Sequence, residues 1–423
     1  MTQEKKHSGT GQDCPKGYKS CDGYRIPKEW HIVRFDSLFS RVTRKNDENN
    51  QNVLTISAQQ GLINQIEYYN TLYASENKTE YTLLHRGDFS YNKSYSSGYA
   101  YGAIKRLDAY EKGIVSPLYL CFTPRQGVIS DFYLQYFEAG CFDREIYKIA
   151  QEGARNHGLL NVSTEDFFHS MLVFPPLEEQ ERITEFLTQC DHVIELKEQK
   201  LDELKQLKKE FLRKMFPAKG CDTPEIRFPG FTGAWEQRKL GDVSESYSGG
   251  TPSVGNKSYY GGSIPFIRSA EINSESTELF LTEEGLSNSS ARMVSKGDIL
   301  YALYGATSGE AGRSHINGAI NQAILAILPH DGYDSEFLMQ WLRKSKQSII
   351  DVYLQGGQGN LSGAIVKALE VNFPSLAEQR QIGNYFQSLD HLITLHQREL
   401  EETKTYKKTL AKLLLTGIVR VQG

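Results

Sequence analysis

Two segments of the sequence carry residue types that could hold phosphate or a metal ion. The stretch 250–258 has the glycines and the lysine of a phosphate-binding loop, but Asn256 separates the second glycine from Lys257, and a proline inside the loop removes one N–H donor. Glu76 and Lys78 have the Glu-x-Lys spacing of metal-dependent nucleases, without an aspartate upstream at the end of an expected strand. Both patterns are incomplete, so the sequence predicts neither a nucleotide site nor a metal site.

Two Asp-His pairs could in principle do acid–base chemistry, at Asp191–His192 and Asp390–His391. Adjacent residues on a helix point about 100° apart, and neither pair has a third ligand or a nucleophile at a suitable spacing. A second Glu-x-Lys triplet, at 198–200, is interpreted as the solvated face of a helix. No glycine-rich loop after a strand is present to hold S-adenosylmethionine. We therefore expect helix-packing roles for both pairs, and no catalytic residue, metal or cofactor in this chain.

Several polar, glycine-rich loops contain the side chains that commonly contact nucleic acid. Asn, Gln, Arg, Ser and Tyr bind base edges and phosphates in DNA grooves. The alternative is ordinary turn chemistry, in which the same side chains only satisfy the backbone of their own loop. The candidate DNA-contacting residues are Asn92, Lys93, Ser94, Tyr95, Arg155, Asn156, Lys257, Tyr259, Tyr260, Arg268, Gln355, Gln358 and Asn360.

The elements that would position these loops are indicated by an internal repeat. The segment that begins at Phe174 occurs again from Phe373, at an offset of 199 residues and without a gap. The residues of the first copy that have an identical counterpart 199 positions later are Phe174, Pro175, Leu177, Glu179, Gln180, Ile183, Asp191, His192, Ile194, Leu196, Lys208 and Lys209. Chance does not produce this agreement, so the chain is a duplication.

The repeated segment has the apolar spacing of a coiled coil. Apolar residues recur at alternating three- and four-residue steps, which places them on one face of a helix roughly 60 Å long. Lysine occupies the same seam position in both copies, at Lys208 and Lys407, which favours control of the register. Ser375 and Glu378 predict a capping box, and Gly417 ends the second helix. A single seam cannot be buried, so the two helices are expected to pair. The expected pairing residues are Ile183, Leu187, Ile194, Leu201, Leu204, Phe211, Ile382, Phe386, Ile393 and Leu400.

Two stretches of about 150 residues precede the two helices and repeat weakly. Residues 83–91 match 293–301, and residues 130–137 match 335–342 with the pattern of a short amphipathic helix. Short strands are expected at 264–267, 299–302 and 324–328. We predict an α+β fold: two mixed α/β domains separated by two long helices that pair as an antiparallel coiled coil, with an internal pseudo-two-fold repeat. The predicted boundaries are a flexible polar tail at 1–23, domains at 24–173 and 225–372, and spacer helices at 174–218 and 373–417.

The composition is typical of a soluble globular protein. The chain has 423 residues, a net charge of −4 and a mean hydropathy of −0.48. The sequence has no run of eighteen apolar residues, the length that a membrane-spanning helix needs, and residues 1–22 lack the apolar stretch of a signal peptide. The six cysteines form no Cys-x-x-Cys pair, so we expect reduced thiols and a cytoplasmic location.

This arrangement resembles the specificity subunit of type I restriction-modification systems. The resemblance covers nearly the whole chain from Tyr24 onward, and it rests on the order domain, helix, domain, helix. Residues 174–180 (FPPLEEQ) and 373–379 (FPSLAEQ) look like the Pro-x-x-x-Glu-Gln signature of that family at both helix starts. Residues 249–252 (GGTP) with 259–266 (YYGGSIPF) are similar to the start of its target recognition domains. The first domain lacks the GGTP segment, so base contacts are not carried over to it.

The resemblance implies a non-catalytic reader of double-stranded DNA. Each recognition domain would bind one half of a split target, while the helices space the halves and dock two methyltransferase subunits. Those subunits would carry S-adenosylmethionine, and restriction/translocase subunits would bring ATP and Mg. The net charge of −4 predicts that the chain alone holds phosphate poorly. Two other classes stay open at this stage, a coiled-coil scaffold and a stand-alone metal-dependent nuclease that uses Glu76 and Lys78.

Overall fold

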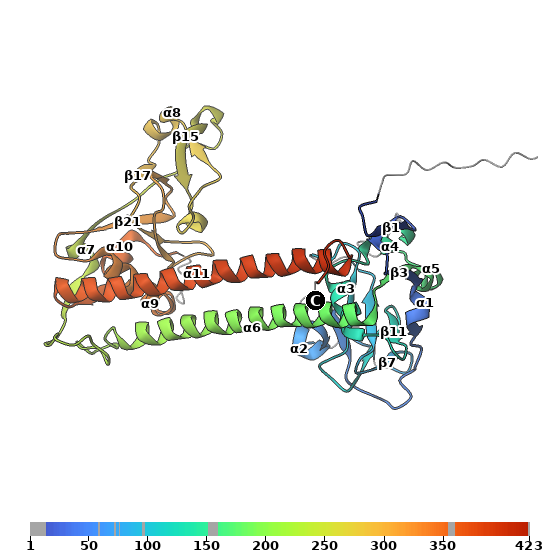
Figure 1. The fold of residues 1–423 in the computed structure, drawn as a ribbon. Helices are drawn as coiled ribbons and strands as arrows, with labels where there is room; N and C mark the ends of the chain where they lie inside the picture. The colour runs from blue at the N-terminus through green and yellow to red at the C-terminus, as the bar shows by residue number, and fades with distance from the viewer. Residues whose placement is uncertain are drawn as a thin grey trace, which may run out of the picture. The chain divides into compact units, whose positions relative to one another are not determined.

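The computed structural model describes residues 14–57, 60–71, 73–75, 77–94, 98–150, 160–353 and 360–421. The chain forms two compact units. The first contains residues 1–196 and 400–423, and the second contains residues 197–399. Each unit therefore includes one globular part, one half of the first long helix and one half of the second (Figure 1). The predicted domain boundaries cut the chain at other points and stay a prediction.

The first unit is built around a four-stranded antiparallel sheet. Its strand order is β4 (Phe39–Arg41), β11 (Leu120–Pro124), β8 (Phe89–Asn92) and β9 (Ala103–Arg106). Aromatic rings fill the core because alternate strand residues point to one face: the rings of Phe89 and Phe122 stack with centroids 5.3 Å apart. Helix α3 (Ser130–Glu138) contributes further buried aromatic residues to the same core.

Two-stranded sheets and short helices surround that sheet. The pairs are β1 (Tyr18–Cys21) with β2 (Tyr24–Pro27), β3 (His31–Arg34) with β12 (Met171–Phe174), β5 (Leu54–Ser57) with β6 (Gly61–Asn64), and β7 (Thr82–His85) with β10 (Lys112–Val115). The short helices are α1 (Phe35–Leu38), α2 (Gln65–Tyr69), α4 (Asp143–Ile149) and α5 (Thr164–His169). The segment predicted as a flexible tail contains strand β1. From Tyr18 onward its backbone is ordered by antiparallel pairing with β2.

The second unit contains the same sheet order. Its first sheet is β14 (Ser244–Ser248), β21 (Ile324–Pro329), β18 (Ile299–Ala302) and β19 (Ala311–Arg313). Its second sheet is β16 (Phe280–Leu281), β15 (Tyr260–Ile267), β20 (Gly318–Ile320) and β17 (Arg292–Val294), in which β15 and β20 run parallel. The pair β13 (Glu236–Lys239) and β22 (Glu370–Phe373) corresponds to β3 and β12. The other elements are α7 (Leu240–Val243), α8 (Glu283–Ser287), α9 (Ser335–Tyr353), α10 (Gly363–Lys367) and the 3₁₀ turns η1 (Lys257–Tyr259) and η2 (Ser269–Glu271).

The predicted strands at 264–267, 299–302 and 324–328 are present in β15, β18 and β21. Both predicted short helices are also present, in α3 and α9. Helix α9 runs on to Tyr353, past the predicted end at 342, and residues such as Ser345 and Ile349 continue its buried face.

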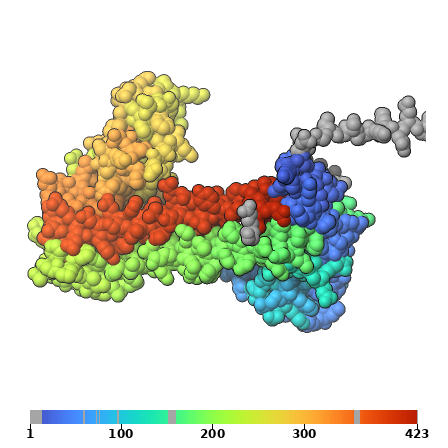
Figure 2. All heavy atoms as spheres, viewed as in Figure 1, coloured from blue at the N-terminus to red at the C-terminus, as the bar shows by residue number. Residues whose placement is uncertain are grey.

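Two long helices, α6 (Leu177–Lys214) and α11 (Leu376–Leu415), run antiparallel, so the predicted fold class is confirmed. In each unit, half of α6 packs against half of α11 (Figure 2). Half of the predicted capping box at the start of α11 forms: the N–H of Glu378 donates to Ser375 Oγ at 3.4 Å, whereas the Glu378 carboxylate accepts hydrogen bonds from Arg227. Helix α11 ends at Leu415, and Gly417 beyond it has a φ of +73°.

Most of the expected pairing residues are buried in the described helices. Those below a tenth exposed are Ile183, Leu187, Leu201, Leu204, Ile382, Phe386 and Leu400, whereas Ile194, Phe211 and Ile393 are half-buried. In the first unit Ile183 and Leu187 share a cluster with Leu414 and Leu415, and in the second Met215 shares one with Ile382 and Phe386. Among the described residues, no helix has the length and apolarity to cross a membrane.

Candidate nucleic-acid interface

Five of the thirteen residues predicted to contact DNA lie outside the described residues. They are Tyr95, Arg155, Asn156, Gln355 and Gln358. The other eight fall into two groups, one per unit. Asn92, Lys93 and Ser94 belong to the first unit, and Lys257, Tyr259, Tyr260, Arg268 and Asn360 belong to the second. The assignment of all thirteen to DNA stays a prediction.

In the first unit, the predicted contacts lie where strand β8 ends. The side-chain oxygen of Asn92 accepts a hydrogen bond from the N–H of Ser94 at 3.0 Å. Lys93 turns its ammonium toward the protein, where Nζ donates to the carbonyl oxygen of Val162 at 2.7 Å. Burial lowers the pKa of Lys93. These contacts organise the turn, so a phosphate at Lys93 would have to compete with the carbonyl of Val162.

In the second unit, one turn brings three predicted residues together. Asn256 caps η1 by accepting from the N–H of Ser258 at 3.2 Å, and Lys257 and Tyr259 lie within this turn. Tyr260 begins β15, and its hydroxyl donates to the carbonyl oxygen of Pro252 at 2.7 Å. Lys257 is exposed, whereas both tyrosines are half-buried. The turn is thus held by its own hydrogen bonds and presents an exposed basic side chain.

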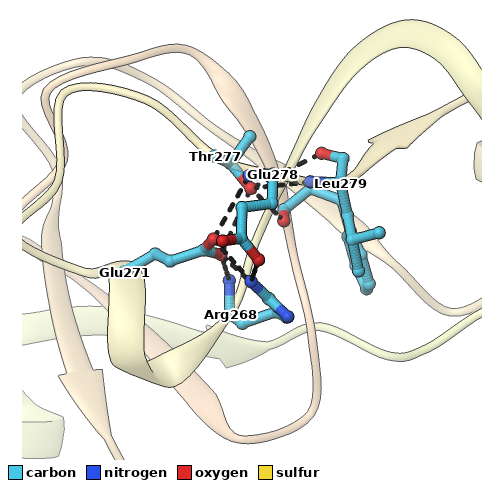
Figure 3. A network of polar contacts seen from close by, with 6 residues as sticks. Arg268, Glu271, Thr277, Glu278 and Leu279 are labelled. Atoms are coloured by element: carbon cyan, nitrogen blue, oxygen red, sulfur yellow. Dashed lines mark hydrogen bonds and ion pairs between the residues drawn. The ribbon is translucent and has the colours of Figure 1, made fainter. Parts of the chain in front are cut away.

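Arg268 comes directly after β15 and is held by two carboxylates (Figure 3). Its Nε donates to Glu271 at 3.1 Å, and its Nη2 donates to Glu271 at 2.8 Å and to Glu278 at 2.7 Å. Burial alone would raise the pKa of Glu271, but hydrogen bonds from Arg268 and from the N–H of Glu278 lower it to about 2. Glu278 is 82% exposed, so it is the partner that a phosphate group could replace.

Gly250, the first glycine of the incomplete phosphate-loop pattern, and Gly249 before it have a packing role. A Cβ atom added to Gly249 would overlap the carbonyl oxygen of Ile320, and one added to Gly250 would overlap the side chain of Ser290. The chain after β14 therefore lies too close to its neighbours for any other residue. This close approach accounts for Gly249 and Gly250 without a bound phosphate, whereas a Cβ atom added to Gly255, the second glycine of the pattern, would meet no atom closer than 3.9 Å.

The nuclease alternative gains no support from the described residues. Glu76 itself lies outside them. The described part of the chain has no group of three or more His, Cys, Asp or Glu side chains arranged to hold a metal ion.

The two Asp-His pairs mark the places where each globular part is attached to the helices. In the first unit, Asp191 of α6 accepts from Lys407 Nζ of α11 at 2.6 Å and from Gln135 Nε2 of α3 at 3.0 Å. Lys407 also donates to Gln135 Oε1 at 3.3 Å, which closes a triangle of three elements. His192 is exposed. The aspartate therefore packs the helices together and takes no part in an acid–base pair with the histidine.

The second unit repeats this arrangement with its helices exchanged. Asp390 of α11 accepts from Lys208 Nζ of α6 at 2.6 Å and from Gln340 Nε2 of α9 at 2.9 Å. Arg343 adds a third contact to Asp390 at 3.2 Å. We call the two Gln-Asp-Lys groups the joints: Gln135, Asp191 and Lys407 form the first joint, and Gln340, Asp390 and Lys208 form the second.

Sequence reasoning identified the lysines and aspartates of the joints but missed the glutamines. The signal was present, because Gln135 and Gln340 occupy the same position of the matching segments 130–137 and 335–342. A helix match alone does not say which side chain faces a helix distant in sequence.

Comparison with known proteins agrees with this geometry. The family model described as the type I restriction modification DNA specificity domain matches residues 27–206 and 233–405, one match on each repeat. The MjaVIII type I restriction enzyme specificity subunit of Methanocaldococcus jannaschii is 23% identical over 96% of this chain and 97% of its own. The HindI specificity subunit of Haemophilus influenzae is 31% identical over 33% of this chain and 32% of its own.

Two solved structures share the fold. A chain from a study of complex assembly and conformational transition of the type I R-M system superposes with a TM-score of 0.61 at 18% identity, over 93% of this chain and 98% of its own. The type I restriction-modification S subunit from M. genitalium superposes with a TM-score of 0.53 at 15% identity, over 91% and 96%.

Proposed function

The chain belongs to the type I restriction-modification DNA specificity family, and we propose that its two recognition domains each read one half of a split DNA target. It is a specificity subunit without catalytic activity of its own. The recognition domains are the globular parts at 24–173 and 225–372. Helices α6 and α11 set the gap between the two half-sites.

The observation that carries this proposal is the repetition of the joint. Gln135, Asp191 and Lys407 hold the first recognition domain to both helices, and Gln340, Asp390 and Lys208 hold the second in the same way. Two equivalent readers attached to an antiparallel helix pair suit a DNA target with two half-sites, because dimeric DNA readers match half-sites by their own two-fold symmetry. A scaffold built on the coiled coil alone would not need a joint between each domain and the helices.

The chemistry belongs to partner subunits. Two methyltransferase subunits would dock on the helices, carry S-adenosylmethionine and flip the target base out of the duplex. Restriction/translocase subunits would add ATP and Mg. This chain binds none of these cofactors. Its contribution is to supply the two DNA-reading surfaces, one for each half of the target, and the helices on which the methyltransferase subunits dock.

The charge of the chain indicates that its partner subunits supply part of the affinity for DNA. Residues 225–372 contain sixteen acidic and twelve basic side chains. Of the predicted contacts, Lys93 and Arg268 already have partners within the protein, whereas Lys257 and Asn360 are exposed. Phosphate neutralisation supplies most non-specific affinity, so the methyltransferase subunits must contribute much of it.

Co-expression with the neighbouring methyltransferase tests the proposal. Native mass spectrometry of the purified complex should give two methyltransferase copies per chain, and the complex should methylate a split sequence. The control is the chain alone, incubated with duplex DNA and Mg²⁺. Cutting by the chain alone would favour the nuclease class, and failure to retain any methyltransferase would contradict the proposed docking.

A further inference from the structure

A second ion pair recurs where each recognition domain runs into its helix. Glu179 and Glu378 occupy the same position of the repeated Glu-Gln motif, in the first turns of α6 and α11, and both are buried. Each lies within a few residues of the last strand of its recognition domain, β12 or β22. A buried carboxylate needs a charged or hydrogen-bonding partner.

Each glutamate receives an arginine in the same two-pronged geometry. In the first unit, Arg420 Nε and Nη2 donate to Glu179 at 2.9 and 2.8 Å. In the second, Arg227 Nε and Nη2 donate to Glu378, both at 2.7 Å. Hydrogen bonds to the glutamates raise the pKa of both guanidinium groups. Such forked pairs fix orientation as well as distance, because two parallel bonds allow little rotation.

The two arginines do not occupy equivalent positions of the repeat. Arg420 lies five residues after the last residue of α11, whereas Arg227 lies thirteen residues after the last residue of α6. The repeat offset of 199 places Cys221, not Arg227, opposite Arg420. Connections of different length thus bring an arginine to the equivalent glutamate in each unit. This agreement indicates that the contact itself matters, and that it is more than a leftover of the duplication.

The contact ties three parts of each unit together. It joins the segment after one long helix to the start of the other, at the point where the recognition domain enters that helix. In the first unit the segment after α11 is further held, because Tyr18 donates its hydroxyl hydrogen to the carbonyl oxygen of Ile418 at 3.1 Å. Trp30 Nε1 also donates to Glu179 at 2.8 Å.

We propose that Arg420 and Arg227 are positioning residues for DNA specificity: each fixes the direction in which its recognition domain leaves the helix pair, and so limits the gaps allowed between half-sites. This inference rests on the proposed function, since it concerns how a split target is measured. The base preference within each half-site depends on the loops of the recognition domain, and among the described residues neither arginine pairs with a candidate DNA-contacting side chain. Loss of the pair therefore relaxes the gap and leaves the bases unchanged.

The test uses the full complex with its methyltransferase subunits and a DNA library whose half-sites are constant and whose gap varies. We compare Arg420→Gln and Arg227→Gln with Arg213→Gln, a matched control at an exposed arginine near the end of α6 that pairs with Glu210 and Glu225. Sequencing of the methylated sites should show at least a tenfold loss of discrimination against gaps one base pair too long or too short in both test variants. The control should discriminate as the wild type does.

A second readout shows whether the effect is local. Hydrogen–deuterium exchange should rise at least tenfold around residues 171–183 in Arg420→Gln and around residues 370–382 in Arg227→Gln, each with the other junction unchanged. General loss of stability would raise exchange at both junctions together. The Arg420→Lys and Arg227→Lys variants keep the charge without the fork, and they should relax the gap to a smaller degree.

If the Gln variants assemble, unchanged discrimination between gaps would overturn the proposal. If they do not assemble, unchanged discrimination in the Lys variants would overturn it. A uniform fall in methylation at every gap, with exchange raised at both junctions, would also overturn it, because that pattern belongs to a purely structural pair. A wild-type complex that methylates no split target would instead refute the proposed function.

Discussion

The stretch of helix between the two joints should act as the ruler for the gap between half-sites. Asp191 and Lys208 are 17 residues apart in α6, and Asp390 and Lys407 are 17 residues apart in α11. At 1.5 Å per residue, each stretch is about 26 Å long. Because the two stretches are equal, both joints can form at once in an antiparallel pair. Any change in length must therefore be made in both helices to keep both joints.

The informative perturbation inserts four residues after Glu203 of α6 together with four after Glu402 of α11. Each insertion lengthens its helix by about 6 Å and rotates the downstream part of that helix by about 400°, which is only some 40° from the starting face. Coiled coils absorb such an insertion as a stutter. An added 6 Å approaches two base-pair rises of about 3.4 Å. We expect an active complex whose methylated sites have a gap longer by one or two base pairs.

Matched insertions of two residues provide the contrast. They turn the downstream seam by about 200°, which would expose Phe211 and Leu204 to water. That complex should fail to assemble or lose methylation. Sequencing of the methylated sites from both insertion variants gives the answer. An active four-residue variant that keeps the original gap would refute the role of the helices as a ruler.

Charge and burial lead to three further predictions. Lys407→Met should lower the free energy of unfolding by about 1 kcal/mol, because it leaves the half-exposed Asp191 without its ion pair, while Lys200→Met at an exposed pair should change it little; chemical denaturation measures both. The chain alone should bind duplex DNA weakly at physiological salt, given its net charge of −4, and nanomolar sequence-specific binding in a titration would contradict this. The pKa of Glu271 is lowered to about 2, so its ion pair with Arg268 stabilises the fold fully at pH values above the ordinary glutamate pKa, and this stability is lost as the pH falls from that value toward 2. NMR titration of the Glu271 carboxyl group should find its midpoint well below that of a free glutamate.

The helices and their order could be predicted because their signals are local and repeated. The seam of apolar residues, the cap at Ser375 and the recurrence of Asp191 and Lys208 at an offset of 199 are all visible without coordinates. The lysines were interpreted as control of register, and in the structure Lys208 and Lys407 each bind an aspartate of the opposite helix.

The contacts that attach the domains could not be predicted, because their partners lie far apart in sequence. Arg420 and Glu179 are separated by 241 residues, and no repeat relates Arg420 to Arg227. The duplication can even mislead. Trp30 and Trp235 begin the two domains in similar contexts, yet Trp30 Nε1 donates to Glu179, whereas the buried Nε1 of Trp235 has no hydrogen-bond partner among the described residues.

The polar loops show a different limit. Their composition favoured DNA contacts for Lys93 and Arg268 alike. Which basic side chain is free for DNA depends on groups elsewhere in the chain: the carbonyl of Val162 holds Lys93, and the carboxylate of Glu278 holds Arg268. Sequence composition identifies a polar loop, but it does not reveal whether the protein already occupies its donors.

An exchange of one recognition domain tests most directly whether each domain reads its own half-site. Residues 245–369 are replaced by the matching segment of a relative with a different target, and the methylated sites of the resulting complex are sequenced. We expect one half of the methylated sequence to change to that of the relative, while the other half stays the same. A change in both halves together, or in neither, would contradict the claim that the two domains read separate half-sites.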